Sequence, residues 1–382
     1  MNKRKKFNVT GLCIPELHYM VDISEKINLI IKDYINNDAY FTINRARQFG
    51  KTTTLRLLEH ALKNNAIVIR ISFEGKEEYF ASFRVLAGGL CFSFYKALKP
   101  EWPNLADIFK PAVNPDYPMQ DLNGRISEFC EKAQKRTVLM IDEVDKAADN
   151  QTFFSFLGVL RDMYLERMDN GTPAFSNVIL AGVHDIKNLK VKMRPDEAHS
   201  YNSPWNVAED FTVDMSFSSE NISRMLEDYE HDHNTGMNIL AMAEGIYGYT
   251  SGYPYLVSRI CKIIDEQLQE KAEFSALKTA WTAEGLTEAV KMLLKETNTL
   301  FDDMNKKISD TPELKNMLYL ILFNGQSVPY NPNNFAINLG VMFGFIKERH
   351  GFVAVSNRIF ETWMYNLFMS EEILENKTYR PS

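Results

Sequence analysis

The sequence predicts an α/β protein that begins with a parallel sheet, continues as an all-helical region and ends in a small helix–hairpin–helix module. Three observations support this fold class. Short β-prone apolar runs alternate with helix-forming segments between residues 40 and 183. Strand signals then stop after about residue 215, and two short β-prone stretches flank Gly351 near the end of the chain. Such alternation of strands and helices is typical of a parallel sheet covered by helices on both faces.

The elements of the first region follow from their residue patterns. A continuous apolar run such as Val138–Ile141 is typical of a strand that is buried on both faces. Strands are expected at 40–44, 66–73, 137–142 and 176–183. Segments with apolar residues at helical spacing predict helices at about 24–36, 51–64, 78–99, 121–135 and 153–168. The stretch 100–120 is rich in Pro, Asn and Asp and is expected to be a loop.

The second half of the chain divides into two further regions. Residues 218–298 are expected to form several helices, with breaks at Gly245, Gly248 and Gly252. Helices are then expected near 312–323 and 334–345, short strands at 345–348 and 352–355, and a final helix at 357–369. Helices followed by a hairpin suggest a winged helix-turn-helix. The expected domains are a core with an N-terminal lead-in (1–215), a helical lid (216–300) and a winged-helix-like domain (301–382).

One motif with chemical meaning lies between the first expected strand and the next helix. Residues 45–53 read R-A-R-Q-F-G-K-T-T. A strand-to-helix junction of this kind suits a phosphate-binding loop, because backbone N–H groups and the helix dipole favour an anion there. Lys51 would reach the β- and γ-phosphates, and the Thr52 hydroxyl would ligate Mg²⁺. The usual pattern G-x-x-x-x-G-K-[ST] has glycine where this chain has Arg45, so the alternative is an ordinary helix N-terminus that carries a lysine.

A second motif closes the buried strand at 137–142. Four apolar residues are followed by Asp142 and Glu143. Two adjacent carboxylates at the end of a buried strand are costly unless a charged partner lies nearby. We expect Asp142 to hold a metal ion and Glu143 to act as the general base for an attacking water. The alternative is a strand that ends in a solvated acidic turn.

With these two motifs, the sequence resembles the AAA-like P-loop ATPases of the STAND and archaeal-ATPase lineage over roughly residues 7–370. These proteins belong to the P-loop class, called ASCE, whose catalytic glutamate follows the metal-binding aspartate. They often replace the first loop glycine and carry R-x-R before G-K-[ST], as Arg45-Ala46-Arg47 does here. The resemblance implies a parallel-sheet core, ATP and Mg²⁺ as ligands, and a nucleotide contact for the loop residues Arg47, Gln48, Phe49, Gly50, Lys51, Thr52 and Thr53.

Four more stretches carry the resemblance. Residues 178–185 are similar to the strand whose end senses the γ-phosphate, a role that falls to His184 or Asp185. Residues 203–208 are similar to the link between core and lid. The segment Gly252-Tyr253-Pro254 is similar to a lid motif whose proline, Pro254 here, packs near the nucleotide base. Residues 355–360 are similar to a signature near the end of the winged helix. The alternatives to these functional roles are structural: His184 would be a buried histidine at the end of a strand, and residues 252–254 would form an ordinary turn between helices.

Composition excludes several classes of protein. The net charge of −7 argues against a surface that binds nucleic acid as a whole. The four cysteines are widely spaced and form no C-x-x-C pair, which favours a reducing cytosol over a disulfide framework or a zinc site. No apolar run approaches the ~20 residues that span a bilayer. We therefore expect a cytoplasmic protein without a membrane segment or secretory signal.

The preferred interpretation is a slow Mg-ATP-hydrolysing ATPase that acts as a nucleotide-dependent switch, with Lys51 and Glu143 as catalytic residues and Thr52 and Asp142 at the metal. The alternatives are an ATP-dependent DNA-binding regulator that uses the C-terminal module, and a scaffold that binds nucleotide without hydrolysis. Residues 310–382 carry six Lys or Arg against seven Asp or Glu, which does not favour DNA. A protein partner is expected, while self-association and the roles of Arg45, Arg47 and Arg194 stay open.

Overall fold

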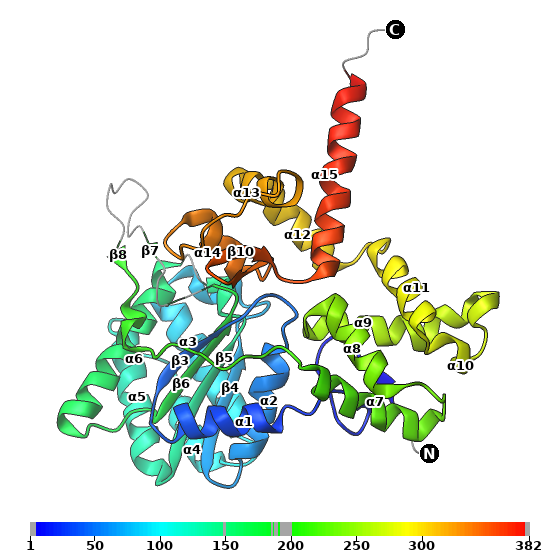
Figure 1. Cartoon of the computed structure of the whole chain (residues 1–382). Coiled ribbons are helices and arrows are strands. Elements are labelled where there is room, and N and C mark those ends of the chain that lie inside the picture. Colours follow the sequence, from blue (N-terminus) through cyan, green and yellow to red (C-terminus); the bar gives the residue numbers. More distant parts are fainter. Residues whose placement is uncertain (1–4, 148–149, 185, 187–189, 192–200, 379–382) are drawn as a thin grey trace. The chain divides into compact units, whose positions relative to one another are not determined.

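The computed structural model describes residues 5–147, 150–184, 186, 190–191 and 201–378 (Figure 1). Contacts divide the chain into two compact units. The sheet unit comprises residues 24–45 and 51–214, and the helical unit comprises residues 1–23, 46–50 and 215–382. Each unit is described below by itself. The expected boundaries between core, lid and winged helix remain predictions.

The sheet unit is built around a parallel four-stranded sheet, as predicted. Its strands are β3 (Tyr40–Asn44), β4 (Ala66–Ser72), β5 (Arg136–Asp142) and β6 (Asn177–Gly182), in the order β3-β6-β5-β4. β6 therefore separates β3 from β5, which lead into the two motifs. On the side of β3 that faces away from β6, a parallel bridge joins Phe41 to Glu209. Because parallel strands end at the same edge, both motifs lie at the carboxyl edge of the sheet, where ligands bind in open α/β sheets.

Helices cover both faces of this sheet, as Figure 1 shows. α2 (Lys51–Leu62) packs against β4, β5 and β6, and α1 (Ser24–Ile30) packs on α2. On the other face, α3 (Phe83–Leu98), α5 (Pro118–Ala133) and α6 (Gln151–Asn170) share one apolar core with alternate residues of the strands. Every residue of β6 is buried, as expected for a strand between two helical layers. The stretch expected to be a loop at 100–120 contains a short helix, α4 (Pro103–Ala106), which proline begins at its first position.

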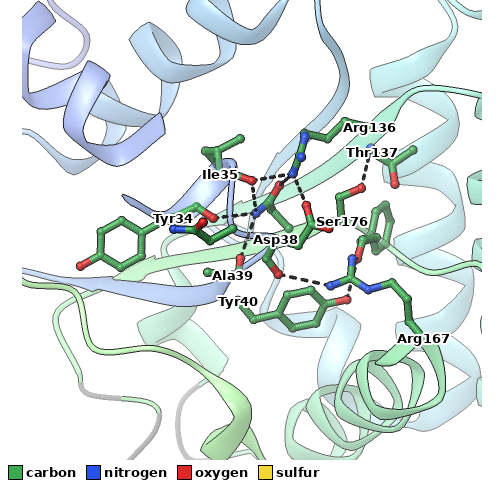
Figure 2. Close-up of polar contacts among 12 residues, drawn as sticks. Tyr34, Ile35, Asp38, Ala39, Tyr40, Arg136, Thr137, Arg167 and Ser176 are labelled. Carbon is green, nitrogen blue, oxygen red and sulfur yellow. Dashed lines mark hydrogen bonds and ion pairs between the residues drawn. The ribbon is translucent and has the colours of Figure 1, made fainter. Parts of the chain in front are cut away.

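A buried asparagine ties the amino ends of the strands together. Asn177 is fully buried, and its side-chain NH₂ donates to the backbone carbonyls of Tyr34, Ile35 and Ala39 at 3.1–3.2 Å. Its Oδ1 accepts a hydrogen bond of 3.1 Å from Arg136. Figure 2 shows this network together with the contacts of Arg136 and Arg167 to the same turn. The chain that enters β3 is thus fixed at the edge opposite the motifs.

The helical unit contains several helices after residue 215, as expected. They are α7 (Ser219–His233), α8 (Ile239–Thr250), α9 (Pro254–Lys262), α10 (Leu277–Ala280) and α11 (Ala283–Leu294). The breaks expected at Gly245 and Gly248 are wrong, because both glycines lie inside one helix, α8. The turn between α8 and α9 requires glycine, because Gly252 has φ +73° and a Cβ there would lie 1.9 Å from the Phe217 carbonyl oxygen. The short parallel strands β1 (Lys6–Phe7) and β2 (His18–Tyr19) belong to this unit, where Phe7 and Tyr19 pack against Tyr229 of α7.

The C-terminal module follows the predicted order of helices and hairpin. It comprises α12 (Thr299–Ser309), α13 (Pro312–Phe323), α14 (Phe335–Met342), the antiparallel pair β9 (Ile346–Arg349) and β10 (Phe352–Val355), and α15 (Arg358–Thr378). α15 extends well beyond the end expected for the last helix. This arrangement alone does not establish a winged helix-turn-helix. Among the helices that the structure describes, none combines the length and the apolar character that crossing a membrane requires.

Candidate functional site

The site begins at the loop between β3 and α2. Two of its residues adopt left-handed backbone conformations, Gln48 with φ +57° and Gly50 with φ +82°. A residue without Cβ adopts the second of these at no steric cost, which explains a glycine directly before α2. Lys51 is the first residue of α2, so the backbone N–H groups of the first helical turn, which no preceding turn of the same helix can pair, lie beside the lysine and Thr52. This is the geometry of an anion-binding helix N-terminus.

Lys51 is held in place from within the loop. Its side chain is buried, with 8% of the residue exposed, and its Nζ donates a 2.9 Å hydrogen bond to the carbonyl oxygen of Arg45. The backbone N–H of Arg45 in turn donates to the carbonyl of Gly182 at the end of β6. The lysine is therefore positioned by the carbonyl of a residue whose own N–H is hydrogen-bonded to the neighbouring strand. A buried ammonium group of this kind is suited to neutralising a bound anion.

The two motifs meet at Thr52 and Asp142. The Thr52 hydroxyl donates a 2.7 Å hydrogen bond to Oδ2 of Asp142, although the two residues are far apart in sequence. Asp142 is buried, with 4% exposed, and its Oδ1 accepts a 2.9 Å hydrogen bond from the backbone N–H of Glu143. The convergence predicted from the sequence is therefore present in the sheet unit.

Glu143 differs from its neighbour in conformation and in electrostatics. Its φ of +55° places it in the left-handed region, which is uncommon for a residue with a side chain and costs about 1–2 kcal/mol. Partial burial, and then the adjacent Asp142 carboxylate, raise the pKa of Glu143, while Lys51 acts in the opposite direction. A carboxylate with a raised pKa is a stronger base than an exposed one, which suits proton abstraction.

A third acid of the same turn, Asp145, holds the end of β6. Its carboxylate accepts from the backbone N–H of Val183 at 2.6 and 2.8 Å and from that of His184 at 2.8 Å. Gly182 makes room for this contact, because a Cβ there would lie 2.9 Å from Oδ1 of Asp145. The carboxylate thus joins the turn after β5 to the turn after β6.

The oxygen atoms at this edge fit a magnesium ion that also binds phosphate. Mg²⁺ prefers oxygen ligands, and it is commonly held by one or two protein groups together with substrate phosphates and water. The Thr52 hydroxyl and the Asp142 carboxylate form such a pair beside a helix N-terminus. The described residues contain no cluster of three or more His, Cys, Asp or Glu that would form an all-protein cage. The two residues that could hold Mg²⁺ here, together with phosphate oxygens and water, are therefore Thr52 and Asp142.

Residues 46–50 of the loop make their other contacts within the helical unit. Arg47 is exposed and forms an ion pair with Asp303 of α12 at 3.5 Å. Gln48 donates a 3.0 Å hydrogen bond to the Thr299 hydroxyl. The rings of Phe49 and Tyr253 meet edge to face with centroids 4.9 Å apart, and the Tyr253 hydroxyl donates to the carbonyl of Arg47.

The remaining sequence-predicted residues are placed as follows. His184 is partly exposed at the end of β6, with its backbone held by Asp145, and Thr53 is partly exposed in the first turn of α2. Pro254 is buried at the first position of α9 in the helical unit. Asp185 and Arg194 lie outside the described residues. Their predicted roles, like those of the other site residues, stay predictions.

Sequence reasoning missed two residues that organise this site. Asp145 carried a signal, since a third acid follows Asp142 and Glu143 after one apolar residue. Its partners, two backbone N–H groups in the turn after β6, are visible only in three dimensions. Arg45 was recognised as the replacement for a glycine, but its carbonyl contact with Lys51 has no sequence signature.

Neither a family model nor a curated protein matches this sequence. Solved structures do match it in fold. The Walker-type ATPase of Pyrococcus abyssi is 12% identical, with a TM-score of 0.58, and the match covers 94% of this chain and 99% of that one. The ORC2 protein of Aeropyrum pernix, solved with ADPNP and ADP, is 10% identical with a TM-score of 0.51, and the match covers 97% and 99%. At these identities the likeness shows the fold, and it confirms at that level the resemblance to AAA-like P-loop ATPases.

Proposed function

We propose that this protein binds ATP with Mg²⁺ and hydrolyses it slowly, as a nucleotide-dependent switch. The observation that carries the proposal is the 2.7 Å hydrogen bond between Thr52 and Asp142, which brings the phosphate loop and the acidic strand end to one point. The likeness in fold to an archaeal Walker-type ATPase supports it. Thr52 and Asp142 would hold Mg²⁺, whose positive charge would offset the negative charge of the phosphates.

The residues of this chain would divide the work of hydrolysis. Lys51 and the N-terminus of α2 bind and neutralise phosphate oxygens. Glu143 accepts a proton from a water molecule as the water oxygen bonds to the γ-phosphorus, while the bond from that phosphorus to the bridging oxygen breaks and ADP leaves; the raised pKa of Glu143 favours this role. Asp145 holds the backbone at the end of β6 beside the turn that carries Glu143. Phosphoryl transfer depends mainly on such positioning and charge neutralisation.

Slow turnover suits a switch, because the ATP-bound and ADP-bound states must each persist. Within the helical unit, the contacts of Arg47, Gln48 and Phe49 with α12 and Tyr253 supply a route by which the state of these loop residues would reach the rest of that unit. A protein partner is the expected reader of that state. DNA is not proposed as the ligand, because the C-terminal module has no basic excess.

The test compares ATP turnover by the wild type with turnover by Glu143→Gln, which keeps the size of the side chain and removes the base. The variant is expected to bind Mg-ATP with similar affinity and to hydrolyse it at least about a hundredfold more slowly, the usual contribution of a general base. Glu131→Gln, an exposed glutamate of α5 in the same unit, serves as a matched control and should hydrolyse at the wild-type rate. Equal turnover by all three proteins would refute the assignment of Glu143.

A further inference from the structure

Arg45 occupies the position where phosphate loops usually have glycine, and its side chain is turned toward another segment of the sheet unit. Its guanidinium donates to the carbonyl oxygens of Val213 at 2.8 Å and Phe211 at 3.3 Å. It also lies over the Phe211 ring, with 5.0 Å between the guanidinium carbon and the ring centroid. A planar guanidinium can make these contacts together in a fixed geometry, whereas a lysine ammonium lacks the flat fork that stacks on a ring while it donates in its own plane.

The segment that Arg45 holds is residues 209–214, here called the link segment, after which the chain enters the helical unit at residue 215. The link segment is otherwise anchored along β3 and α1. Glu209 donates its backbone N–H to the Tyr40 carbonyl, and Phe211 stacks on Phe41 with ring centroids 5.7 Å apart. Lys26 of α1 donates to the carbonyl of Asp214 at 2.6 Å. Among the residues named here that hold the link segment, Arg45 is the one that also belongs to the phosphate loop.

The same residue positions the phosphate-binding lysine through its backbone. The carbonyl of Arg45 accepts from Nζ of Lys51 at 2.9 Å, and its N–H donates to Gly182 at 3.1 Å. Burial of the guanidinium lowers the pKa of Arg45, with the nearby Asp214 carboxylate acting in the opposite direction. Desolvation of an arginine is costly unless hydrogen bonds and charge compensate it, so the contacts with the link segment are part of what keeps this loop residue in place.

We propose that Arg45 is a positioning residue that fixes Lys51 for phosphate binding and couples the phosphate loop to the link segment. This inference rests on the proposed function and adds to it a route from the phosphates to the chain that leaves the sheet unit. It also explains the missing glycine, since an arginine is required here for its side chain. Restoring the standard motif with Arg45→Gly should therefore weaken nucleotide binding instead of improving it.

The first experiment measures Mg-ATP affinity by calorimetry for the wild type, Arg45→Gly and Arg45→Lys. We expect Kd to rise at least about tenfold for Arg45→Gly, which corresponds to about 1.4 kcal/mol. Arg45→Lys should fall between the two, because it keeps the charge and loses the planar fork. In turnover assays KM should rise more than kcat falls. Arg84→Ala, an exposed arginine of α3, is the control for loss of one positive charge and should bind as the wild type does.

The second experiment follows hydrogen exchange of peptides that cover residues 209–214, which reports on the link segment without any nucleotide. Exchange should be faster in Arg45→Gly than in the wild type, while peptides from β5 stay unchanged. Saturating Mg-ATP should slow exchange of the link segment in the wild type and not in Arg45→Gly. Phe211→Leu should weaken ATP binding in the wild-type background and add little in the Arg45→Gly background, because residues that act as a unit are not additive.

The outcomes separate the two proposals. If the wild type binds no adenine nucleotide, the proposed function fails and the coupling fails with it. If the wild type binds ATP and Arg45→Gly binds it equally well or better, the inference about Arg45 is overturned while the proposed function stands. Unchanged exchange of the link segment in Arg45→Gly would also overturn it. If circular dichroism shows that Arg45→Gly does not fold, Arg45→Lys and Phe211→Leu are compared with the wild type in the same two experiments.

Discussion

Replacement of Asp145 by alanine tests how the turn after β5 is joined to the end of β6. The carboxylate accepts from two backbone N–H groups, those of Val183 and His184, at 2.6–2.8 Å. A hydrogen bond to a charged group contributes about 1.5–3 kcal/mol, so two amides give about 3–6 kcal/mol. Because Asp145 is only partly buried, water replaces part of this in the variant. We expect a loss of about 2–4 kcal/mol for Asp145→Ala and about half of that for Asp145→Asn.

The assay is equilibrium unfolding in urea, followed by circular dichroism and by tryptophan fluorescence, to which the buried Trp205 of the sheet unit contributes together with the three other tryptophans. The matched control is Asp162→Ala, which removes an exposed carboxylate from α6 and should leave the free energy of unfolding within about 0.5 kcal/mol of the wild-type value. If Asp145→Ala is as stable as the control, the carboxylate does not hold the two turns together. Hydrolysis should fall as well in Asp145→Ala, because His184 and Glu143 lose their common support.

Two further predictions concern proton transfer and the opposite edge of the sheet. The pKa of Glu143 is raised above the ordinary glutamate value of 4.5, so its carboxylate should become protonated, and hydrolysis should be lost, while the pH is still above that value. A pH profile of kcat/KM whose acid limb lies at or below 4.5 would contradict this. Asn177→Ala should cost about 2–4 kcal/mol in urea unfolding, because it removes one hydrogen bond from each of the carbonyls of Tyr34, Ile35 and Ala39. The Tyr34 and Ile35 carbonyls keep backbone N–H donors, so a loss below about 1 kcal/mol would show that these donors and water replace the asparagine.

The sequence allowed the core of the fold to be predicted because its strands are buried on both faces. Uninterrupted apolar runs such as Val138–Ile141 have few structural alternatives, and the strands formed where expected. The stretch 100–120 was harder, because Pro, Asn and Asp favour both turns and helix starts, and Pro103 begins a short helix there. The lengths of terminal helices such as α15 depend on tertiary contacts that no local pattern encodes.

The parts of the candidate site that consist of adjacent residues could be predicted from the sequence. The parts that depend on contacts between residues of different strands could not. Gly50, Lys51 and Thr52 form a recognisable string, and Asp142 follows a buried run. Strand order decides whether such motifs converge, and sequence does not give strand order directly. The contact of Arg45 with the link segment joins residues more than 160 positions apart, as its hydrogen bond to Phe211 shows, and it follows from topology alone.

Calorimetric titration of the wild type and of Lys51→Ala with ATP, in the presence and absence of Mg²⁺, tests the central claim most directly. We expect the wild type to bind ATP more tightly with Mg²⁺ than without it, because Thr52 and Asp142 are placed to hold the ion. Lys51→Ala should lose at least about tenfold in affinity, since the lysine neutralises phosphate charge. Absence of binding by the wild type, or equal affinity of the two proteins, would contradict the assignment of this edge of the sheet as a nucleotide site.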